Sequence, residues 1–84
     1  MHYVYILVSL NYPTRYYIGR TENLEIRLQQ HNRGESGYSK RYAPWRLETY
    51  IAFSNPRLAE DLERYLKSGS GHAFLKRHFL PEIR

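Results

Sequence analysis

The segment between residues 16 and 32 constrains the fold most, because a strand pattern passes there into a helix pattern within a few residues. Aromatic and β-branched side chains precede Gly19, as is typical of a strand. Gly19 itself permits either an unusual backbone angle or the close approach of another group. Thr21 or Asn23 can cap the helix that follows, which we expect over residues 24–32.

Arg27 and His31 lie one turn apart on this expected helix and border the apolar stripe that Leu24 and Leu28 form. The ordinary interpretation is that both side chains cover the edge of the core while their polar ends reach water. The alternative is phosphate chemistry, because a guanidinium grips two phosphate oxygens and an imidazole transfers protons near neutral pH. The residue types leave both interpretations open.

Two further strands are expected. Residues 3–9 combine β-branched, aromatic and aliphatic side chains, which predicts a strand buried on both faces. A turn at residues 11–14 joins it to the strand at 15–20, so the pair should form an antiparallel hairpin. A third strand is expected over about 46–53, after a segment at 34–45 that lacks any period and that we expect to be a mobile, basic loop.

Two helices should follow the third strand. Asn55-Pro56 predicts the start of a helix that runs to about residue 67. Residues 68–71 are expected to form a turn, and a last helix is expected over about 72–79 before Pro81 stops it. The apolar side chains that would face the core are Leu58, Leu62, Tyr65 and Leu66 on the first of these helices and Phe74, Leu75 and Phe79 on the second.

Length and composition limit the class of protein. At 84 residues the chain is expected to be one domain, 1–84, that buries roughly 60% of its unfolded surface. The absence of cysteine excludes disulfides and thiolate chemistry, and it fits a cytoplasmic setting. The apolar run at 3–8 is too short to span a membrane and lacks the features of a signal peptide. We therefore expect no membrane partner.

The positive charge is concentrated in the first half of the chain. The net charge is +5, and residues 1–46 hold seven Lys and Arg against three Glu, whereas residues 47–84 hold six against five acidic residues. Basic and aromatic side chains alternate in this half, which suits a polyanion that also has bases or sugars to contact. The alternative is that the charge serves solubility alone. The basic residues are Arg15, Arg20, Arg27, Arg33, Lys40, Arg41 and Arg46, and the aromatic ones are Tyr12, Tyr16, Tyr17, Tyr38 and Tyr42.

Three further side chains could carry chemistry. Tyr5 and Tyr17 can share one face of the hairpin, where they could pack in the core or, with a cation nearby, serve as a base. Glu63 is an acid beside the apolar stripe of its helix; it could pair with Lys67 one turn on, or bind a hard cation whose other ligands are water and phosphate. The four histidines lack zinc-site spacing, and no glycine-rich phosphate loop is present.

Taken together, these elements resemble the GIY-YIG nuclease superfamily, and in particular its small stand-alone bacterial branch. The resemblance covers nearly the whole chain. It rests on Tyr3-Val4-Tyr5, on Tyr17-Ile18-Gly19, on Arg27 with His31, on Glu63 with Lys67, and on the segments 66–71 and 73–76. It implies an α+β fold of order β-β-α-β-α-α, in which about three helices flank a small three-stranded antiparallel sheet.

The resemblance also implies roles for individual residues. Tyr17 occupies the position of the proposed general base, and Tyr5 would support or share that role. Arg27 matches the arginine that stabilises the pentacovalent phosphate, and His31 stands where relatives use Tyr or His. Glu63 matches the metal ligand.

The chain departs from the family pattern at two places. Tyr3 replaces the first glycine of the name motif, and the asparagine that some relatives carry after the glutamate is not evident. The second departure leaves open what Ser68, Ser70 or His72 does.

The function expected from the resemblance is a structure-selective endonuclease that uses one Mg²⁺ or Mn²⁺ ion to hydrolyse DNA and serves DNA repair or recombination. DNA is the expected partner, with RNA, a partner protein and the oligomeric state left open. The alternative is a binding module that keeps the fold, cuts poorly and acts with a partner protein. The residues expected to bind nucleic acid are Arg20, where relatives often have Lys, and Arg33, Lys40, Arg41 and Lys67.

Overall fold

The computed structural model describes residues 1–35 and 37–80. Within them the chain forms three strands and four helices. In chain order these are β1 (His2–Ser9), β2 (Tyr16–Thr21), α1 (Leu24–Asn32), α2 (Gly37–Tyr42), β3 (Trp45–Phe53), α3 (Pro56–Leu66) and α4 (Gly69–His78).

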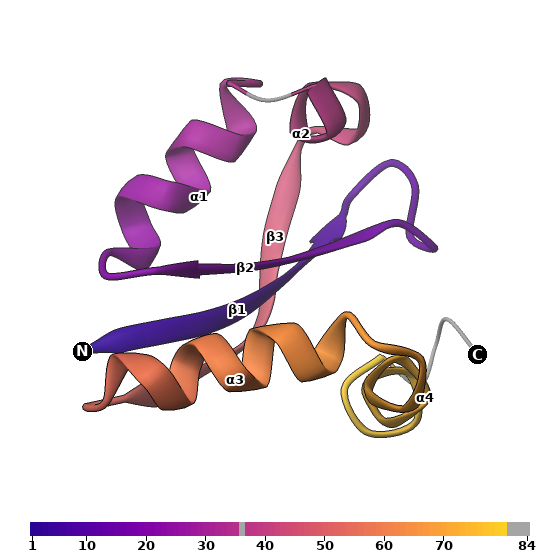
Figure 1. The fold of residues 1–84 in the computed structure, drawn as a ribbon. Helices are drawn as coiled ribbons and strands as arrows, with labels where there is room; N and C mark the ends of the chain where they lie inside the picture. Colours follow the sequence, from indigo (N-terminus) through magenta and orange to yellow (C-terminus); the bar gives the residue numbers. More distant parts are fainter. Residues whose placement is uncertain (36, 81–84) are drawn as a thin grey trace.

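The strands make one antiparallel sheet in the order β2-β1-β3, so β1 is central and β2 is an edge strand. Figure 1 shows α1 and α2 on one side of the sheet and α3 and α4 on the other. The predicted α+β fold with a three-stranded antiparallel sheet is therefore confirmed, with one helix more than expected.

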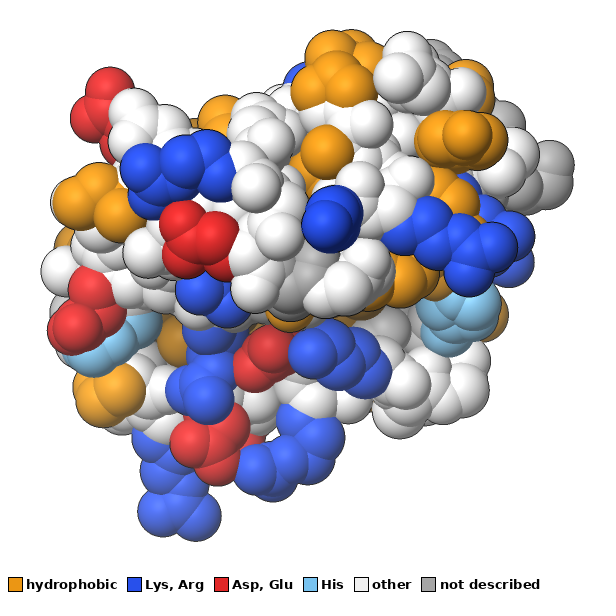
Figure 2. Space-filling model, turned by 90° about the horizontal axis from the view of Figure 1, so that it is seen from above, with side chains coloured by type: hydrophobic (Ala, Val, Ile, Leu, Met, Phe, Trp, Pro, Cys, Tyr) orange, Lys and Arg blue, Asp and Glu red, His pale blue; other side chains and the backbone are white. Residues whose placement is uncertain are grey.

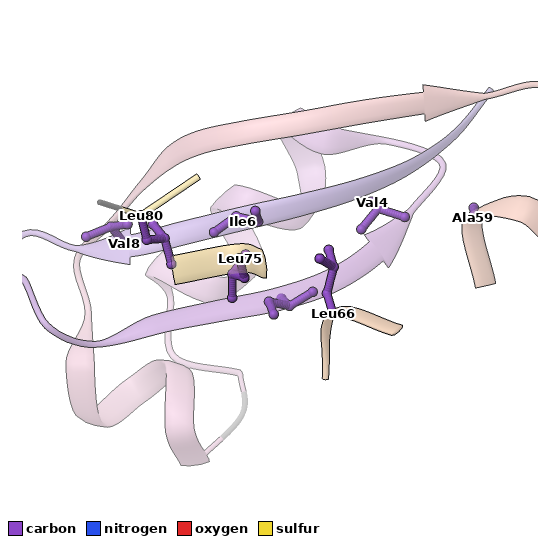
Figure 3. Close-up of a cluster of buried hydrophobic side chains, with 8 residues drawn as sticks. Val4, Ile6, Val8, Ala59, Leu66, Leu75 and Leu80 are labelled. Carbon is purple, nitrogen blue, oxygen red and sulfur yellow. The ribbon is translucent and has the colours of Figure 1, made fainter. Parts of the chain in front are cut away.

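Alternate residues of β1 supply the two cores, as the twofold period of a strand requires. Val4, Ile6 and Val8 face α3 and α4, where they pack with Leu66 and Leu75 (Figure 3). On the opposite face, Tyr5 and Leu7 pack with Tyr42 and Trp45 under α1 and α2. The first core is aliphatic, whereas the second contains phenol hydroxyls that need hydrogen-bond partners.

Side-chain caps fix where the helices begin. The Asn23 side chain accepts from the Ile26 amide at the start of α1, and Asn55 accepts from the Arg57 amide at the start of α3. Each cap satisfies an amide that the helix itself leaves unpaired. Helix α1 has the predicted bounds, and Asn23 rather than Thr21 is its cap.

The expectation of a loop at residues 34–45 is wrong in part, because α2 lies within it. This helix is short and owes its position to tertiary contacts: Ser39 and Tyr42 are buried, and the Trp45 indole donates to the Ser39 carbonyl over 2.9 Å. Propensity alone does not reveal a helix that packing stabilises.

The turn expected at 68–71 is also wrong in part: the chain bends at Ser68, but Gly69–Gly71 form the first turn of α4. Ser68 caps that helix by accepting from the Gly71 amide. A Cβ on Gly71 would lie 1.6 Å from the Tyr65 carbonyl oxygen, so the glycine permits close packing of α4 on the end of α3. The expected stop at Pro81 lies outside the described residues.

The buried stripe of α3 is rotated from the prediction. Ala59 and Leu66 are fully buried and Leu62 is half-buried, whereas Leu58 and Tyr65 are exposed. On α4, Leu75 is buried and Phe79 half-buried, but Phe74 is exposed. The small Ala59 side chain lets α3 approach the sheet closely, and this rotation places Glu63 at the margin of the buried face. None of the helices in the described part of the chain is long and apolar enough to cross a membrane.

Candidate active site

The hairpin register brings Tyr5 and Tyr17 to the same face of the sheet. Tyr5 pairs with Gly19 and Leu7 pairs with Tyr17, so these four residues all point toward α1. The two tyrosine rings stack with their centroids 6.3 Å apart.

Gly19 makes room for Tyr5. A Cβ at this position would lie 2.4 Å from the Tyr5 hydroxyl oxygen and 2.6 Å from Cζ, far inside any allowed contact. Gly19 does not have a positive φ, so of the two reasons expected for this glycine the close approach applies. The phenol ring therefore lies across β2, and its hydroxyl reaches the outer edge of the sheet.

The Tyr5 hydroxyl is held from two sides by α1. It lies 2.8 Å from His31 Nε2, and Arg27 Nε donates to its oxygen over 3.3 Å. The second His31 nitrogen, Nδ1, lies 2.6 Å from the Ser39 hydroxyl of α2. With the hydrogen of the imidazole on Nδ1, His31 donates to Ser39 and its Nε2 accepts from the Tyr5 hydroxyl, which in turn accepts from Arg27. Each polar atom of this hydrogen-bond network then has a partner.

Burial keeps His31 neutral. The residue is 3% exposed, and burial, followed by the nearby Arg27 charge, lowers its pKa. Burial also raises the pKa of Tyr5, an effect that the Arg27 hydrogen bond and charge only partly oppose. Tyr5 and His31 are therefore a protonated phenol and a neutral imidazole at neutral pH.

Arg27 lies beside both tyrosines. Its hydrogen bond to Tyr5 contributes most to raising its pKa, and the proximity of Tyr17 adds to the rise. A second guanidinium nitrogen donates to Gln30 over 3.0 Å. The guanidinium is thus oriented by neighbours on two elements while it remains half-buried at the surface.

Tyr17 differs from Tyr5 in its access to solvent. It is half-buried, it packs against His31 with ring centroids 4.5 Å apart, and it lines an open cavity beside β2. Tyr5, at 2% exposed, has both hydrogen-bonding directions occupied. A water molecule can therefore reach Tyr17 but not Tyr5.

Glu63 comes from the opposite layer. Arg20 of β2 points toward α3, and its Nε donates to Glu63 Oε1 over 2.7 Å; Lys67 donates to Oε2 over 3.0 Å. The Glu63 carboxylate is close enough to the Tyr5 hydroxyl to contribute to its raised pKa. Because β2 is the edge strand, a residue of α3 on one side of the sheet can lie near the tyrosines on the other side.

The structure therefore gathers Tyr5, Tyr17, Arg27 and His31 into one contact cluster, with Glu63 at its margin. Glu63 also makes the pair with Lys67 that its sequence position suggested. Of the residues expected to bind nucleic acid, Arg20 and Lys67 adjoin Glu63, whereas Arg33 pairs with Glu35 at 3.1 Å. Lys40 and Arg41 lie exposed on α2.

Two further residues contribute to this region: Ser39, which sequence reasoning missed, and Tyr38, which it named only among the aromatic side chains that accompany the basic ones. Ser39 fixes His31, and Tyr38 packs against Tyr17 with ring centroids 6.1 Å apart. Both lie on α2, which the sequence pattern did not reveal. The signal available was the aromatic density of residues 38–45, which exceeds what a solvated loop needs.

Comparison with known proteins assigns the class. Residues 1–76 match the model of the GIY-YIG catalytic domain, so the chain belongs to the GIY-YIG family, a family of endonuclease domains that act on DNA. It is similar to the UPF0213 protein CPE1444 of Clostridium perfringens (strain 13 / Type A), with 38% identity over 68 residues that cover 80% of this chain and 71% of that protein.

Proposed function

We propose that this protein is a divalent-metal-dependent endonuclease that hydrolyses DNA phosphodiester bonds with the cluster at the edge of β2. The observation that supports this most is the joining of Tyr5, Arg27 and His31 in one hydrogen-bonded network directly beside the solvent-accessible Tyr17. A permanent cation and proton-transfer groups within contact distance match the needs of phosphoryl transfer.

Tyr17 is the proposed base for the attacking water. The phenol lies at the open side of the cluster, where it packs against His31 and lines the cavity beside β2. The Tyr17 hydroxyl first releases its own proton to solvent. As the water oxygen bonds to phosphorus, a proton of that water passes to the Tyr17 oxygen and the bond to the leaving strand breaks. The leaving oxygen then takes up a proton from solvent.

Tyr5 and His31 are proposed to position Arg27 and Tyr17. The chain Ser39–His31–Tyr5 fixes the phenol that accepts from Arg27, so the guanidinium is oriented before substrate binds. Arg27 would then offset the charge that develops on the phosphate oxygens. Preorganised donors need no rearrangement at the moment of reaction, which is where most of their benefit lies.

Glu63 is the carboxylate that we propose holds a metal ion. Each of its oxygens makes one hydrogen bond, and an ionised carboxylate accepts about four in total, so both oxygens keep capacity for a cation. Within residues 1–35 and 37–80 no three acidic, histidine or cysteine side chains gather around a common point. This fits Mg²⁺ or Mn²⁺ bound by one carboxylate, with water and substrate phosphate as the other ligands. A bound ion would polarise the phosphate and stabilise the leaving oxygen.

The surface favours weak, sequence-independent contact with the DNA backbone. Figure 2 shows basic side chains interspersed with acidic ones over the face seen from above. Lys40 and Arg41 of α2, with Arg20, Arg33 and Lys67, are the proposed phosphate contacts. Because salt bridges already engage Arg20, Arg33 and Lys67, binding should be modest and should weaken with salt.

A panel of substrates tests this function. Purified protein is incubated with branched, flapped, nicked and fully paired DNA, and with RNA, in Mg²⁺, Mn²⁺ or a chelator. We expect metal-dependent cleavage of DNA that Tyr17→Phe reduces by about 100-fold or more, whereas the matched exposed variant Tyr50→Phe cleaves normally. Absence of metal-dependent cleavage on every substrate would reject the proposal.

A second candidate function is a DNA-binding module that cuts poorly and acts with a partner protein. One observation favours it: Arg20 and Lys67 both hold the Glu63 carboxylate, so a metal ion must compete with two cations. Tight binding without turnover on the same panel would support this alternative. The single-domain organisation 1–84, the cytoplasmic setting and the role in DNA repair or recombination remain predictions.

A further inference from the structure

A cavity of about 430 Å³ adjoins the catalytic cluster. It lies between β2, α2 and the junction of α3 with α4, and its volume falls in the range of about 300–1,000 Å³ typical of small-ligand sites. Its floor contains the buried Ile18 and Leu66, and Tyr17 belongs both to its wall and to the cluster.

Aromatic rings form the walls of this cavity. Tyr17 and Tyr38 form one pair of lining rings with centroids 6.1 Å apart. Tyr16 and His72 form a second pair with centroids 5.9 Å apart, and the Tyr16 hydroxyl is hydrogen-bonded to His72 Nε2. The lining of the cavity therefore combines four rings with polar atoms.

The Tyr38 ring is held in place before any ligand arrives. Its hydroxyl donates to the Tyr16 carbonyl over 3.0 Å, and its ring packs on Tyr42 and Trp45 with centroid distances of 5.0 and 5.9 Å. Yet the residue remains 41% exposed, so one part of it is available. A fixed aromatic side chain loses little entropy when a ligand stacks on it.

The cavity also connects to the proposed phosphate site. Lys67 lines it, and the same side chain donates to Glu63 over 3.0 Å. A ligand with a flat apolar ring and an adjacent phosphate would place the ring in the cavity and the phosphate near Lys67, Glu63 and Tyr17. A nucleotide has this shape, and aromatic walls bind any base because every base has a π-face.

We propose that this cavity receives one unpaired nucleobase of the DNA strand that is cut, next to the scissile phosphate; this inference rests on the proposed function. A base in a paired duplex must first leave its stack, which costs free energy, whereas a base in a flap, gap or single-stranded end enters directly. The cavity would thereby select substrates with an unpaired nucleotide at the cleavage position.

Fluorescence of 2-aminopurine tests the proposal without requiring cleavage. The probe is placed as an unpaired base at each position along a flapped DNA, and the titration uses Glu63→Gln protein in a chelator. We expect quenching at one position, as stacking on tyrosine produces, and little change when the same base is paired. Tyr38→Leu should weaken this binding by about tenfold, and Tyr38→Phe, which keeps the ring, should retain it.

The controls separate stacking from damage to the fold. Tyr50→Leu makes the same change at an exposed tyrosine on the opposite edge strand and should leave the quenching intact. His72→Ala removes a lining ring that comes from α4, so it should weaken binding even if Tyr38→Leu disturbs α2. Circular dichroism and Tm of each variant report whether the fold persists.

Failure of this inference is distinct from failure of the proposed function. Metal-dependent cleavage with no position-specific quenching, or with quenching unaffected by both Tyr38→Leu and His72→Ala, would overturn the base site and leave the nuclease intact. Quenching without cleavage by the wild-type protein would support the base site and reject the nuclease. A free mononucleotide that binds as tightly as the flapped strand would overturn the assignment to a DNA strand.

Discussion

Gly19→Ala should disturb the catalytic cluster directly, because the three atoms nearest to the added methyl group all belong to Tyr5 and Tyr17. The new Cβ would lie 2.4 Å from the Tyr5 hydroxyl oxygen, 2.6 Å from Tyr5 Cζ and 3.0 Å from Tyr17 Cε1. Ordinary contact begins at 3.4 Å, so the Tyr5 hydroxyl must retreat by about 1 Å.

A shift of this size breaks the network. The Tyr5 hydroxyl lies 2.8 Å from His31 Nε2 and 3.3 Å from Arg27 Nε, so a displacement of about 1 Å toward or away from either partner would leave the range of hydrogen-bond distances. Overpacking of a buried ring costs about 1–3 kcal/mol, which lowers Tm by about 10 °C in a domain of this size. Misplacement of a catalytic group by about 1 Å costs about 100-fold in rate.

The assay compares Gly19→Ala with Gly37→Ala. A Cβ at Gly37 meets no atom within 4 Å, so this control should change stability by no more than about 0.5 kcal/mol and leave cleavage unchanged. We measure Tm and the cleavage rate on the best substrate at a temperature where both variants are folded. Wild-type cleavage by folded Gly19→Ala would refute the claim that the position of Tyr5 governs the site.

Three further predictions concern stability. Burial, followed by the charge of Arg27, lowers the pKa of His31 below its unfolded value of about 6.5. The unfolded chain therefore takes up the proton first, so the free energy of unfolding is highest above pH 6.5 and falls as the pH drops toward the folded-state pKa. In urea unfolding at pH 5–8, the dependence of this free energy on pH should be weaker for His31→Gln than for the wild type, and an equal dependence would contradict the prediction. Gly71→Ala, whose Cβ would lie 1.6 Å from the Tyr65 carbonyl oxygen, should cost about 3 kcal/mol or more, whereas Gly69→Ala, with nothing within 4 Å, should be nearly neutral in thermal melts. Asn55→Ala removes the cap of α3 and should cost about 1 kcal/mol in the same melts; an unchanged Tm would show that the cap contributes nothing.

The local rules of helix and strand formation recovered most of the elements because their signals lie within a few residues. Asn23 and Asn55 start their helices as their side chains predict, and the hairpin forms where the turn at 11–14 allows. The parity of Tyr5 and Tyr17 was likewise enough to place both on one face.

The rest depends on contacts between distant residues, which periodicity does not encode. Helix α2 exists because Ser39 and Tyr42 are buried by other elements. Glycine is typical of turns, yet the role of Gly71 is to let α4 approach the Tyr65 carbonyl. Packing also decides which face of α3 is buried. Leu58 and Tyr65 are as apolar as the buried Ala59 and Leu66, so hydrophobicity alone did not distinguish the two faces.

The candidate site shows the same division. The sequence indicated that Arg27 and His31 share a face, and the resemblance proposed their roles. The sequence could not show that His31 is buried between Tyr5 and Ser39, nor that Arg20 also pairs with Glu63. The His31 contacts join α1 to β1 and α2, and the Arg20–Glu63 pair joins β2 to α3, so they become visible only when the elements are placed around the sheet.

The most direct test of the account compares Glu63→Gln with Glu60→Gln in metal-dependent DNA cleavage. Both substitutions remove one negative charge near Arg20 from the same helix, and Glu60 lies 3.7 Å from that guanidinium. Both pairs are partly exposed, so each change should alter stability by about 1 kcal/mol or less.

Because only Glu63 is proposed to hold the metal ion, Glu63→Gln should lower the Mg²⁺- or Mn²⁺-dependent cleavage rate by about 100-fold or more, with Tm nearly unchanged. Glu60→Gln should cleave at close to the wild-type rate. Equal cleavage by the two variants, at any metal concentration, would contradict the central claim that Glu63 completes the active site at the edge of β2.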